Sequence, residues 1–483
     1  MVPVTAVSRM TKTSVGACGV SARRRVCAAA VALLLIAPTS GARAQAAELS
    51  LDEAVARALT CSTRLAALKS SIDVSRRIIN EKWRSYLPDV GVSYSKEDTV
   101  AYREDDYRSQ SILLNVGVDL YNGGRTSAEY RIAKLEALLA AEEYRIERNA
   151  IVLNVRSLYY ELLKNLDEIA INRKLMESLE LQRTIIAEEE RLGMATELQR
   201  VQVEARIAEA EYGILKSENE YQNRLKDLRV LIGLAPGAAL ALTRMEIASA
   251  PVTAITRGRD ELVAIALAKR NEFKKSTYLL YKTGREMELA RAYYLPTIRL
   301  TGSYGYTGDR YPPNKKMWNV GISVTTAIFG SSLSGAQNYG ESNNGGTRSA
   351  QRSGQAGLYD NPSYASAIIR TEASHREARL AHDLLRKSIA IEVVRAHDSV
   401  RENATRIAVS EKNVALLEKQ VAIEDAKARL GEITRYDVLK TYLDLSSARL
   451  RRLVAKTDYL IAIAVLERTL GYDIGKLSGA HAQ

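Results

Sequence analysis

The chain has 483 residues, of which 46% are hydrophobic, so it can bury one large core or several smaller ones. It contains 25 tyrosines beside 2 phenylalanines and 2 tryptophans, which is unusual for a dry core because each tyrosine hydroxyl needs a hydrogen-bond partner. The formal net charge is +12, and six basic residues without any acid in residues 1–44 account for half of it. The remaining charges are mixed in sign along the chain, which argues against nucleic acid as a partner.

Residues 1–44 have the pattern of a signal peptide. Arg23–Arg25 precede an apolar run over residues 26–36, and Ala42-Arg43-Ala44 fits a cleavage site. The run is too short to span a bilayer, and no later stretch approaches about 18 consecutive apolar residues. We therefore expect the segment to be removed and no inner-membrane helix to follow.

The cysteines predict no chemistry. Cys18 precedes the apolar run and Cys27 begins it, so neither is placed like a lipidated cysteine. Cys61 is the one cysteine after the predicted cleavage site, and a single cysteine forms no internal disulfide. We expect Cys61 to be a small buried residue.

The next segment predicts a helix followed by a pair of strands. Ser50-Leu51-Asp52-Glu53 has the form of a capping box, and we expect its helix to run to about Tyr86, before Leu87-Pro88. Alternating apolar residues then predict two strands around an exposed loop, Lys96–Ser109. The alternating residues are Val90, Val92 and Tyr94 in the first strand, and Ile112, Leu114, Val116, Val118 and Leu120 in the second.

A long helical hairpin is expected after the strands. Neither glycine nor proline occurs from Arg125 to Leu192, and Gly193 then has the position of a left-handed helix stop. Thr196 and Gln199 form a second capping-box pattern, which starts a returning helix that reaches about Ile232. Residues 191–196 are therefore predicted to be the tip of the hairpin.

The chain is an internal duplication. The tip recurs as Arg429–Thr434, and residues 191–234 align without a gap on 429–472. Tyr294-Leu295-Pro296 likewise repeats the sequence found at residues 86–88. We predict a first repeat over 45–245, a linker over 246–257, a second repeat over 258–476 and a C-terminal tail over 477–483.

The second repeat follows the same plan with one addition. A helix over 260–293 is expected to precede two strands, with alternating Ile298, Leu300, Gly302, Tyr304 and Tyr306 in the first and Trp318, Val320, Ile322 and Val324 in the second. Ser331–Ser363 is rich in serine, glycine and asparagine, and we expect a disordered insertion that is dispensable for folding. A breaker-free helix then extends from about residue 365 to residue 430.

These lengths favour a membrane protein with a long helical part. Each breaker-free helix would be about 100 Å long, and the shorter returning helix would cover only part of it, so the helix before each strand pair is expected to cover the rest. Four strands of about ten residues with one apolar face have the size of membrane-spanning strands, yet four cannot close a barrel. Open edges in lipid leave backbone groups unpaired, so the chain is expected to form a ring-shaped oligomer.

The combined motifs resemble those of the TolC-like outer-membrane efflux proteins. They are Leu51-Asp52-Glu53-Ala54-Val55, the two Tyr-Leu-Pro junctions, Leu120–Arg125, the two tips, and Gly431–Leu439. The resemblance implies a mainly α-helical fold with a membrane β-barrel part, in which three protomers share a 12-stranded barrel above a periplasmic α-barrel. It also implies an outer-membrane location, a homotrimer in outer-membrane lipid, a periplasmic adaptor protein and an inner-membrane pump as partners, and no cofactor.

The resemblance assigns two functional regions. The tips would dock the adaptor, through Arg191, Leu192, Gly193 and Thr196 in the first hairpin and Arg429, Leu430, Gly431 and Thr434 in the second. Asp437 would belong to an acidic ring at the closed periplasmic end of the duct. Lys440 replaces a second acid that is usual in the family, and Gln199 takes the corresponding place in the first repeat.

Other functions find less support. His375 and His382 lie seven residues apart on a predicted helix, but no further histidine or cysteine joins them at metal-ligand spacing, so we predict no metal site and no enzyme. The alternative is a structural coiled-coil protein of the periplasm or cell surface. The four predicted amphipathic strands argue against it, because a coiled-coil rod does not need them. The exported substrate is not predicted.

Overall fold

The computed structural model describes residues 48–99, 107–235, 237–243, 247, 257–328, 330–342, 346–360 and 363–472. The predicted signal peptide and C-terminal tail lie outside these residues, as does most of the predicted linker. The chain divides into two compact units: residues 1–48 with 239–241, and residues 49–238 with 242–483. Apart from the two-residue strands β1 (Glu48–Leu49) and β4 (Ala241–Leu242), the elements described below belong to the second unit.

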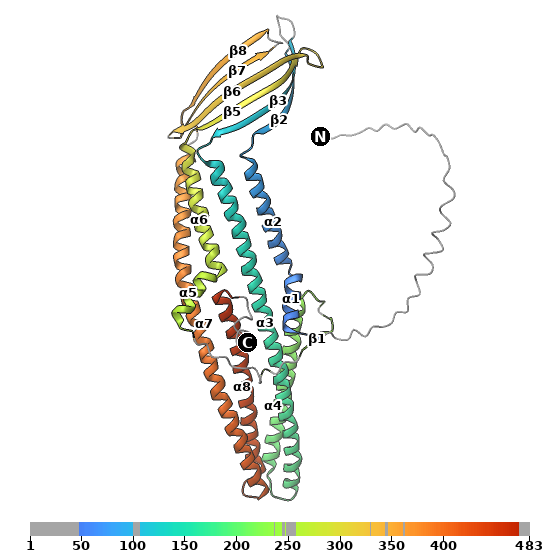
Figure 1. Ribbon diagram of the computed structural model, residues 1–483. Helices are drawn as coiled ribbons and strands as arrows, with labels where there is room; N and C mark the ends of the chain where they lie inside the picture. The colour runs from blue at the N-terminus through green and yellow to red at the C-terminus, as the bar shows by residue number, and fades with distance from the viewer. Residues whose placement is uncertain are drawn as a thin grey trace, which may run out of the picture. The chain divides into compact units, whose positions relative to one another are not determined.

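Two 67-residue helices dominate the second unit. Helix α3 (Arg125–Arg191) returns as α4 (Glu197–Leu231), and α7 (Ser363–Arg429) returns as α8 (Arg435–Leu470). At about 1.5 Å per residue, α3 and α7 are each about 100 Å long, as the breaker-free runs predict. Figure 1 shows both hairpin tips at the end of this unit remote from the large sheet.

The helices before the strand pairs are each broken in two, whereas the sequence predicts continuous helices. Ser62 ends α1 (Leu51–Cys61) and caps α2 (Thr63–Arg84), with its hydroxyl accepting from the Leu65 N–H at 3.3 Å. Arg270 separates the corresponding helices, α5 (Arg259–Lys269) and α6 (Asn271–Arg291), the second of which is followed by the 3-10 turn η2 (Ala292–Tyr294). Both cap residues have extended backbone conformations, which interrupt the helix at each place. Cys61, the last residue of α1, is exposed, so the prediction of a buried cysteine is wrong.

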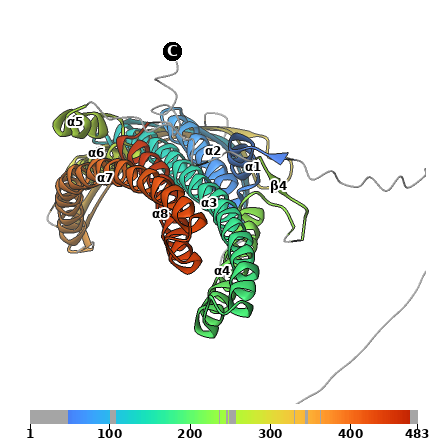
Figure 2. The ribbon, with the colours of Figure 1, turned by 90° about the horizontal axis from the view of Figure 1, so that it is seen from below.

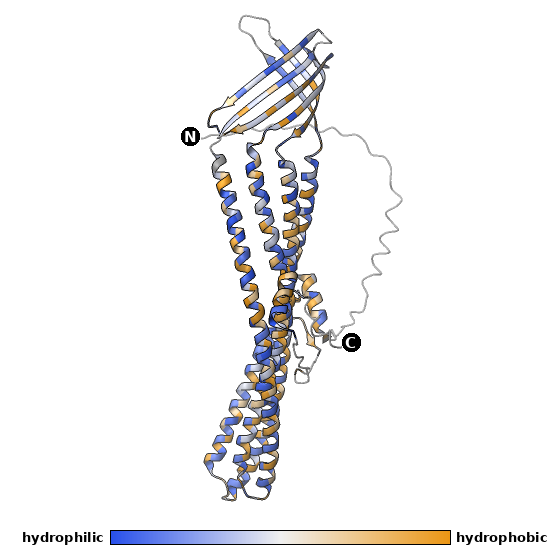
Figure 3. Cartoon of the chain, turned by 60° about the vertical axis from the view of Figure 1, so that its left-hand side comes forward, coloured by the Kyte–Doolittle hydropathy of each residue, from blue (hydrophilic) through white to orange (hydrophobic). Residues whose placement is uncertain are grey.

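The short helices complete the cover of the long ones, as predicted. Within the second unit α2 packs on α3, and α6 packs on both α3 and α7, while α8 contacts α7 and α3. Seen along the helices in Figure 2, α7, α8, α3 and α4 follow one another around an arc. Hydrophobic and hydrophilic residues alternate along all of them (Figure 3), as expected of helices that bury one side.

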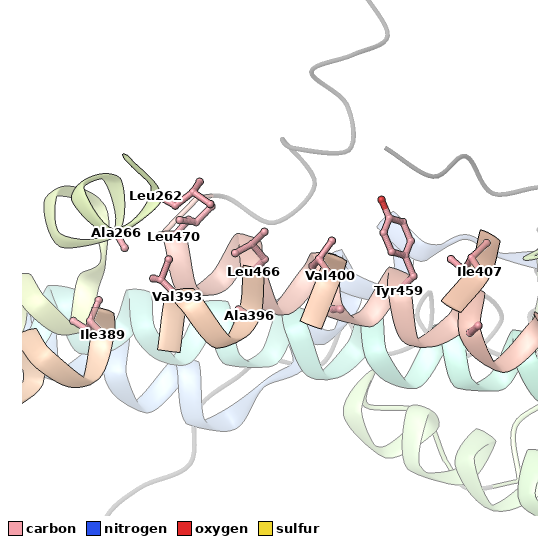
Figure 4. Packing of buried hydrophobic residues seen from close by; sticks show 12 residues of the cluster. Leu262, Ala266, Ile389, Val393, Ala396, Val400, Ile407, Tyr459, Leu466 and Leu470 are labelled. Atoms are coloured by element: carbon pink, nitrogen blue, oxygen red, sulfur yellow. The ribbon is translucent and has the colours of Figure 1, made fainter. Parts of the chain in front are cut away.

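A large apolar cluster lies where α5 meets α7 and α8. Figure 4 shows Leu262 and Ala266 of α5 beside Val393 of α7 and Leu470 of α8. The cluster continues down α7 and α8 to Ile407, with all of these side chains almost fully buried. Burial of this order contributes roughly 1.5–3 kcal/mol for each large aliphatic side chain, which holds the second hairpin together and fixes α5 against it.

Six strands form one antiparallel sheet in the order β2-β3-β5-β6-β7-β8. The strands are β2 (Asp89–Thr99), β3 (Tyr107–Tyr121), β5 (Thr297–Gly308), β6 (Lys315–Ile328), β7 (Ser331–Ser342) and β8 (Thr347–Gly357). The first four are the predicted strands, and the first pair extends further than expected into residues assigned to an exposed loop. The sheet is open, with β2 and β8 at its edges.

The prediction of a disordered insertion over residues 331–363 is wrong. Most of it forms β7 and β8, and β7 pairs with β6 along its length from Trp318↔Glu341 to Ile328↔Ser331. Gly330, in the turn before β7, has φ +78°. Strand pairing satisfies the backbone of this segment without any apolar periodicity, which is why the side-chain pattern does not reveal it.

One face of the first four strands is apolar. Val92 of β2 faces Leu114 of β3, which in turn faces Tyr304 of β5, and Tyr304 faces Trp318 of β6. Large apolar side chains on this face are well exposed in the single chain. A layer of exposed apolar side chains is the expected surface of strands that contact lipid. Among the described residues, no helix is long and apolar enough to cross a membrane.

Candidate functional site

The first hairpin tip is built by two helix-end motifs. Gly193 adopts φ +73°, its N–H donates to the Glu190 carbonyl at 2.9 Å, and the Met194 N–H donates to the Glu189 carbonyl at 2.8 Å. This is a Schellman motif, for which glycine is preferred because it lacks a Cβ. Thr196 then caps α4, with the Gln199 N–H donating to its hydroxyl at 3.4 Å. The turn is therefore fixed by the backbone bonds at Gly193 and by the side-chain cap at Thr196.

The second tip repeats the first. Gly431 adopts φ +78°, and the Glu432 N–H donates to the Lys427 carbonyl at 3.0 Å. Thr434 caps α8 in a capping box with Asp437. Both helix stops and both caps predicted from the sequence are confirmed.

Apolar side chains stand in solvent at both tips. Leu192 is 65% exposed and Leu430 is 77% exposed, although neither helix stop requires a leucine. Met194 adds to the first tip with an exposure of 71%. Arg191 is also exposed and forms an ion pair with Glu188 at 3.2 Å, whereas Arg429 has no ion pair within the part of the chain that the structure describes. Together these residues present an apolar surface with a basic side chain beside each leucine.

The turn that carries Asp437 packs against the first hairpin. Leu439 is 1% exposed and joins a cluster with Leu179 and Ile186 of α3 and with Val203 and Ile207 of α4. This contact brings the candidate gate residues of α8 to the first hairpin. It does so through apolar packing rather than through the charged residues.

The three candidate gate residues have different surroundings. The Asp437 carboxylate accepts from the Thr434 hydroxyl at 2.6 Å and from the Thr434 N–H at 3.3 Å. In the first hairpin, the side-chain oxygen of Gln199 accepts in the same way from the Thr196 N–H, at 2.9 Å. Lys440 is exposed and forms no ion pair with Asp437 or with any other described residue, although it follows Asp437 by only three positions.

A polar network ties α7 to α8 just above the second tip. The Tyr442 hydroxyl donates to Asp425 at 3.1 Å, and Arg435 lies 3.8 Å from the same carboxylate. Burial raises the pKa of Tyr442, and its hydrogen bond to Asp425 raises it further. The tyrosine therefore stays a neutral donor well above physiological pH.

Two ionic sites were not predicted from the sequence. Arg299 of β5 contacts Asp119 at 2.9 Å and Asp89 at 2.7 Å on the polar face of the sheet, and it passes over Gly117, where a Cβ would lie 2.6 Å from its guanidinium. The sequence could have predicted this site, because residues of opposite charge occur at polar-face positions of predicted strands. The second site, the ion pair between Arg156 of α3 and Glu467 of α8, left no such signal.

The histidines are not a metal site in this structure. His375 meets the Thr283 hydroxyl at 3.1 Å and His382 meets the Ser276 hydroxyl at 3.2 Å, so each pairs with α6. No group of three or more metal-ligating side chains is assembled anywhere in the described residues. Both contacts are half-buried and join α7 to α6.

The fold combines two long helical hairpins with an open antiparallel sheet, four strands of which share an apolar face. Residues 42–234 match the family model described as "Outer membrane efflux protein". Over 174 residues the chain is 25% identical to the outer membrane efflux protein BepC of Brucella suis biovar 1 (strain 1330), a match that spans 35% of this chain and 38% of BepC.

Solved structures agree on the fold. The chain is similar to CusC, with a TM-score of 0.72 and 15% identity over 88% of this chain and 93% of that one. It is similar to VceC of Vibrio cholerae, with a TM-score of 0.70 and 16% identity over 88% and 96%. Residues 42–234 thus resemble the outer-membrane efflux family, and the chain as a whole has the fold of the solved outer-membrane channels, which indicates an outer-membrane protein with a large periplasmic helical part. The family model and BepC are described as efflux proteins and CusC as forming a transmembrane channel, in line with a protein that is not an enzyme.

Proposed function

We propose that this protein is the outer-membrane exit duct of a tripartite efflux or type I secretion system. Three copies would close their sheets into one barrel through the outer membrane, and their helical hairpins would continue the passage through the periplasm. The duct has no chemistry of its own, and the energy for transport comes from a pump in the inner membrane.

The observation that carries this proposal is the apolar face on a sheet with open edges. Val92, Leu114 and Val320, on three different strands, all have exposed side chains in the single chain. Exposed apolar strands with unpaired edges are unfavourable in water and, in lipid, leave backbone groups unsatisfied. Closure with further copies of the same chain removes both costs, and a ring is the simplest symmetric way to achieve it.

The tips support a docking role. Leu192 and Leu430 expose apolar surface at the far ends of both hairpins, where a soluble protein would otherwise place polar residues. An adaptor protein in the periplasm is the partner expected there, and its binding would open the duct. BepC is named an efflux protein, which favours export over a purely structural role for this chain.

The test is to fractionate cells that express the mature protein and to characterise what is recovered. We expect it in the outer-membrane fraction, extracted only by detergent, as crosslinkable trimers that give stepwise conductance in planar bilayers. Recovery as a soluble periplasmic rod without conductance would instead support a structural coiled-coil protein. Capture of the assembled complex would then identify the pump and thereby the class of cargo.

A further inference from the structure

The β7–β8 hairpin is the part of the sheet that the proposed duct does not explain. It pairs with the β6 edge, the edge that would otherwise be free to pair with another copy. Its sequence lacks an apolar face: the side chains that continue the apolar face of β6 are Leu333, Gly335, Gln337, Tyr339 and Glu341 on β7, and Arg348, Ala350, Arg352, Gly354 and Ala356 on β8.

The mismatch extends to the middle of β6. Ile322 pairs with Gln337, which pairs with Arg352, so one row across the sheet changes from isoleucine to glutamine to arginine. Arginine on the lipid side of a barrel is most unfavourable near the middle of the bilayer. A wall that included β7 and β8 would therefore interrupt the lipid-facing layer in every protomer.

The hairpin is closed at its own base. The Tyr359 N–H donates to the Ser331 hydroxyl at 3.1 Å, and the Ser332 N–H donates to Asp360 at 2.9 Å, with a second, short contact between the Ser332 hydroxyl and the same carboxylate. These contacts hold the two ends of the hairpin together without any help from β6. Gly330, with φ +78°, lies in the turn that connects the hairpin to β6. The hairpin is thus built to move as a unit.

The strand that would match the β6 edge is β2. Its alternating Val90, Val92 and Tyr94 lie on the same face of the sheet as Ile322, because the register carries that face from β2 through β3 and β5 to β6. Pairing of β6 with β2 of a neighbouring copy would therefore continue the apolar layer without interruption. Pairing of β8 with that β2 would not.

We propose that the β7–β8 hairpin protects the β6 edge in the unassembled protomer and leaves it when β2 of the next copy pairs there. This inference rests on the proposed trimeric duct. An exposed strand edge invites pairing with a wrong partner, and a hairpin of the same chain blocks it until a correct copy arrives. After release, the hairpin lies on the aqueous side of the barrel, since both of its faces are polar.

A reversible disulfide tests the release. In a Cys61→Ser background, Ser323→Cys with Ala336→Cys joins paired positions of β6 and β7, both on the polar face. Oxidation before refolding into detergent should lower the trimer yield at least tenfold, and reduction should restore it. The matched control, Ser334→Cys with Gln355→Cys, joins β7 to β8 and leaves β6 free, so it should trimerise equally well oxidised or reduced.

The outcomes separate the two proposals. Trimers of unchanged yield from the oxidised Ser323→Cys/Ala336→Cys protein would overturn the edge exchange and place the hairpin in the barrel wall. If neither the reduced protein nor the control forms trimers, the proposed duct itself is wrong and the inference falls with it.

Thiol labelling of assembled trimers gives a second readout that needs no paired cysteines. With a membrane-impermeant maleimide, Arg352→Cys should react at least tenfold faster than Ile322→Cys, because the two positions share a row of the present sheet but would lie in water and in lipid after exchange. Equal protection of both positions would contradict the proposal.

Discussion

The Thr434 hydroxyl donates a 2.6 Å hydrogen bond to the carboxylate of Asp437, and the Asp437 N–H donates back to that hydroxyl at 3.3 Å. In the first hairpin Thr196 and Gln199 make the same reciprocal bonds with a neutral side chain. A charge at this position is therefore not needed to start the helix. The carboxylate of Asp437 is free to have an electrostatic role in addition to the cap.

Asp437→Gln should separate these roles because it copies the cap of the first hairpin. We expect the thermal midpoint of the trimer to change by no more than a few degrees, while cation selectivity and block by divalent cations decrease, since three carboxylates would be lost around the axis. Single-channel recording in planar bilayers measures both quantities.

The reciprocal variant is Thr434→Ala, which retains the charge and removes the capping hydroxyl. It should lower the free energy of unfolding by about 0.5–2 kcal/mol and leave the selectivity unchanged. If Asp437→Gln alters neither selectivity nor divalent block, Asp437 is a helix cap and no part of a gate.

Changing Leu192 and Leu430 together to serine should abolish export while trimers still assemble. Both side chains are exposed at the tips, so the folded protomer loses little packing, whereas a docked adaptor would lose two apolar anchors. Site-specific crosslinking to the adaptor in cells measures docking directly. The double change of Leu192 and Leu430 to methionine preserves the apolar surface and should crosslink normally; equal crosslinking of the serine variant would refute docking through these leucines.

Much of this fold is determined by features that a single sequence displays. Runs without glycine or proline predict the two long helices, and a glycine followed three residues later by a threonine predicts both tips. These local motifs can be recognised because they need no distant partner. Alternation of apolar and polar residues predicts β2, β3, β5 and β6, because one face of these strands is apolar. The helix breaks at Ser62 and Arg270 escaped prediction because neither glycine nor proline marks them.

The remaining features depend on contacts between distant segments. β7 and β8 have polar side chains on both faces, so their pairing shows only in the backbone ladder. The contact of Leu439 with the first hairpin, and the ion pair of Arg156 with Glu467 more than 300 residues later, require the two repeats to be placed side by side. Residues 191–196 and 429–434 form turns between helices, as predicted, whereas the docking and gate roles assigned to residues near them stay predictions.

Glu467→Gln should destabilise the protomer strongly. Glu467 of α8 is fully buried, and its carboxylate lies 3.4 Å from the guanidinium of Arg156, which is itself mostly buried. Removing one partner of a buried pair leaves the other charge without compensation, at a cost of about 3–5 kcal/mol. Chemical denaturation followed by circular dichroism measures the change in the free energy of unfolding.

The control for this change is an exposed ion pair on the first hairpin. Arg206 and Glu209 lie 2.6 Å apart with both side chains at least half exposed, so Glu209→Gln should cost less than about 1 kcal/mol. A similar small loss for Glu467→Gln would mean that the buried carboxylate contributes no more than a surface pair.

Tyr159 should make the protein sensitive to alkaline pH. Its side chain is buried, and its hydroxyl donates to the Leu49 carbonyl at 3.2 Å and to the Thr243 carbonyl at 3.0 Å. Burial raises the pKa of Tyr159 above its ordinary value of 10.0, as does the neighbouring Tyr160. The folded chain thus holds this proton more tightly than the unfolded chain, so the stabilisation is complete below pH 10.0 and is lost as pH rises through the raised pKa.

Tyr159→Phe removes both the titrating group and the two hydrogen bonds. We expect it to lower the free energy of unfolding at pH 7 by about 1–3 kcal/mol, since the Thr243 carbonyl loses its donor and the Leu49 carbonyl keeps only the Thr243 N–H, and to flatten the fall in thermal midpoint above pH 10. Tyr212 lies on α4 with its side chain mostly exposed, and Tyr212→Phe should leave both the midpoint and its pH dependence unchanged. A Tyr159→Phe protein that remains as stable as the parent at pH 7, with the same alkaline fall, would show that the hydroxyl of Tyr159 does not hold this part of the fold together.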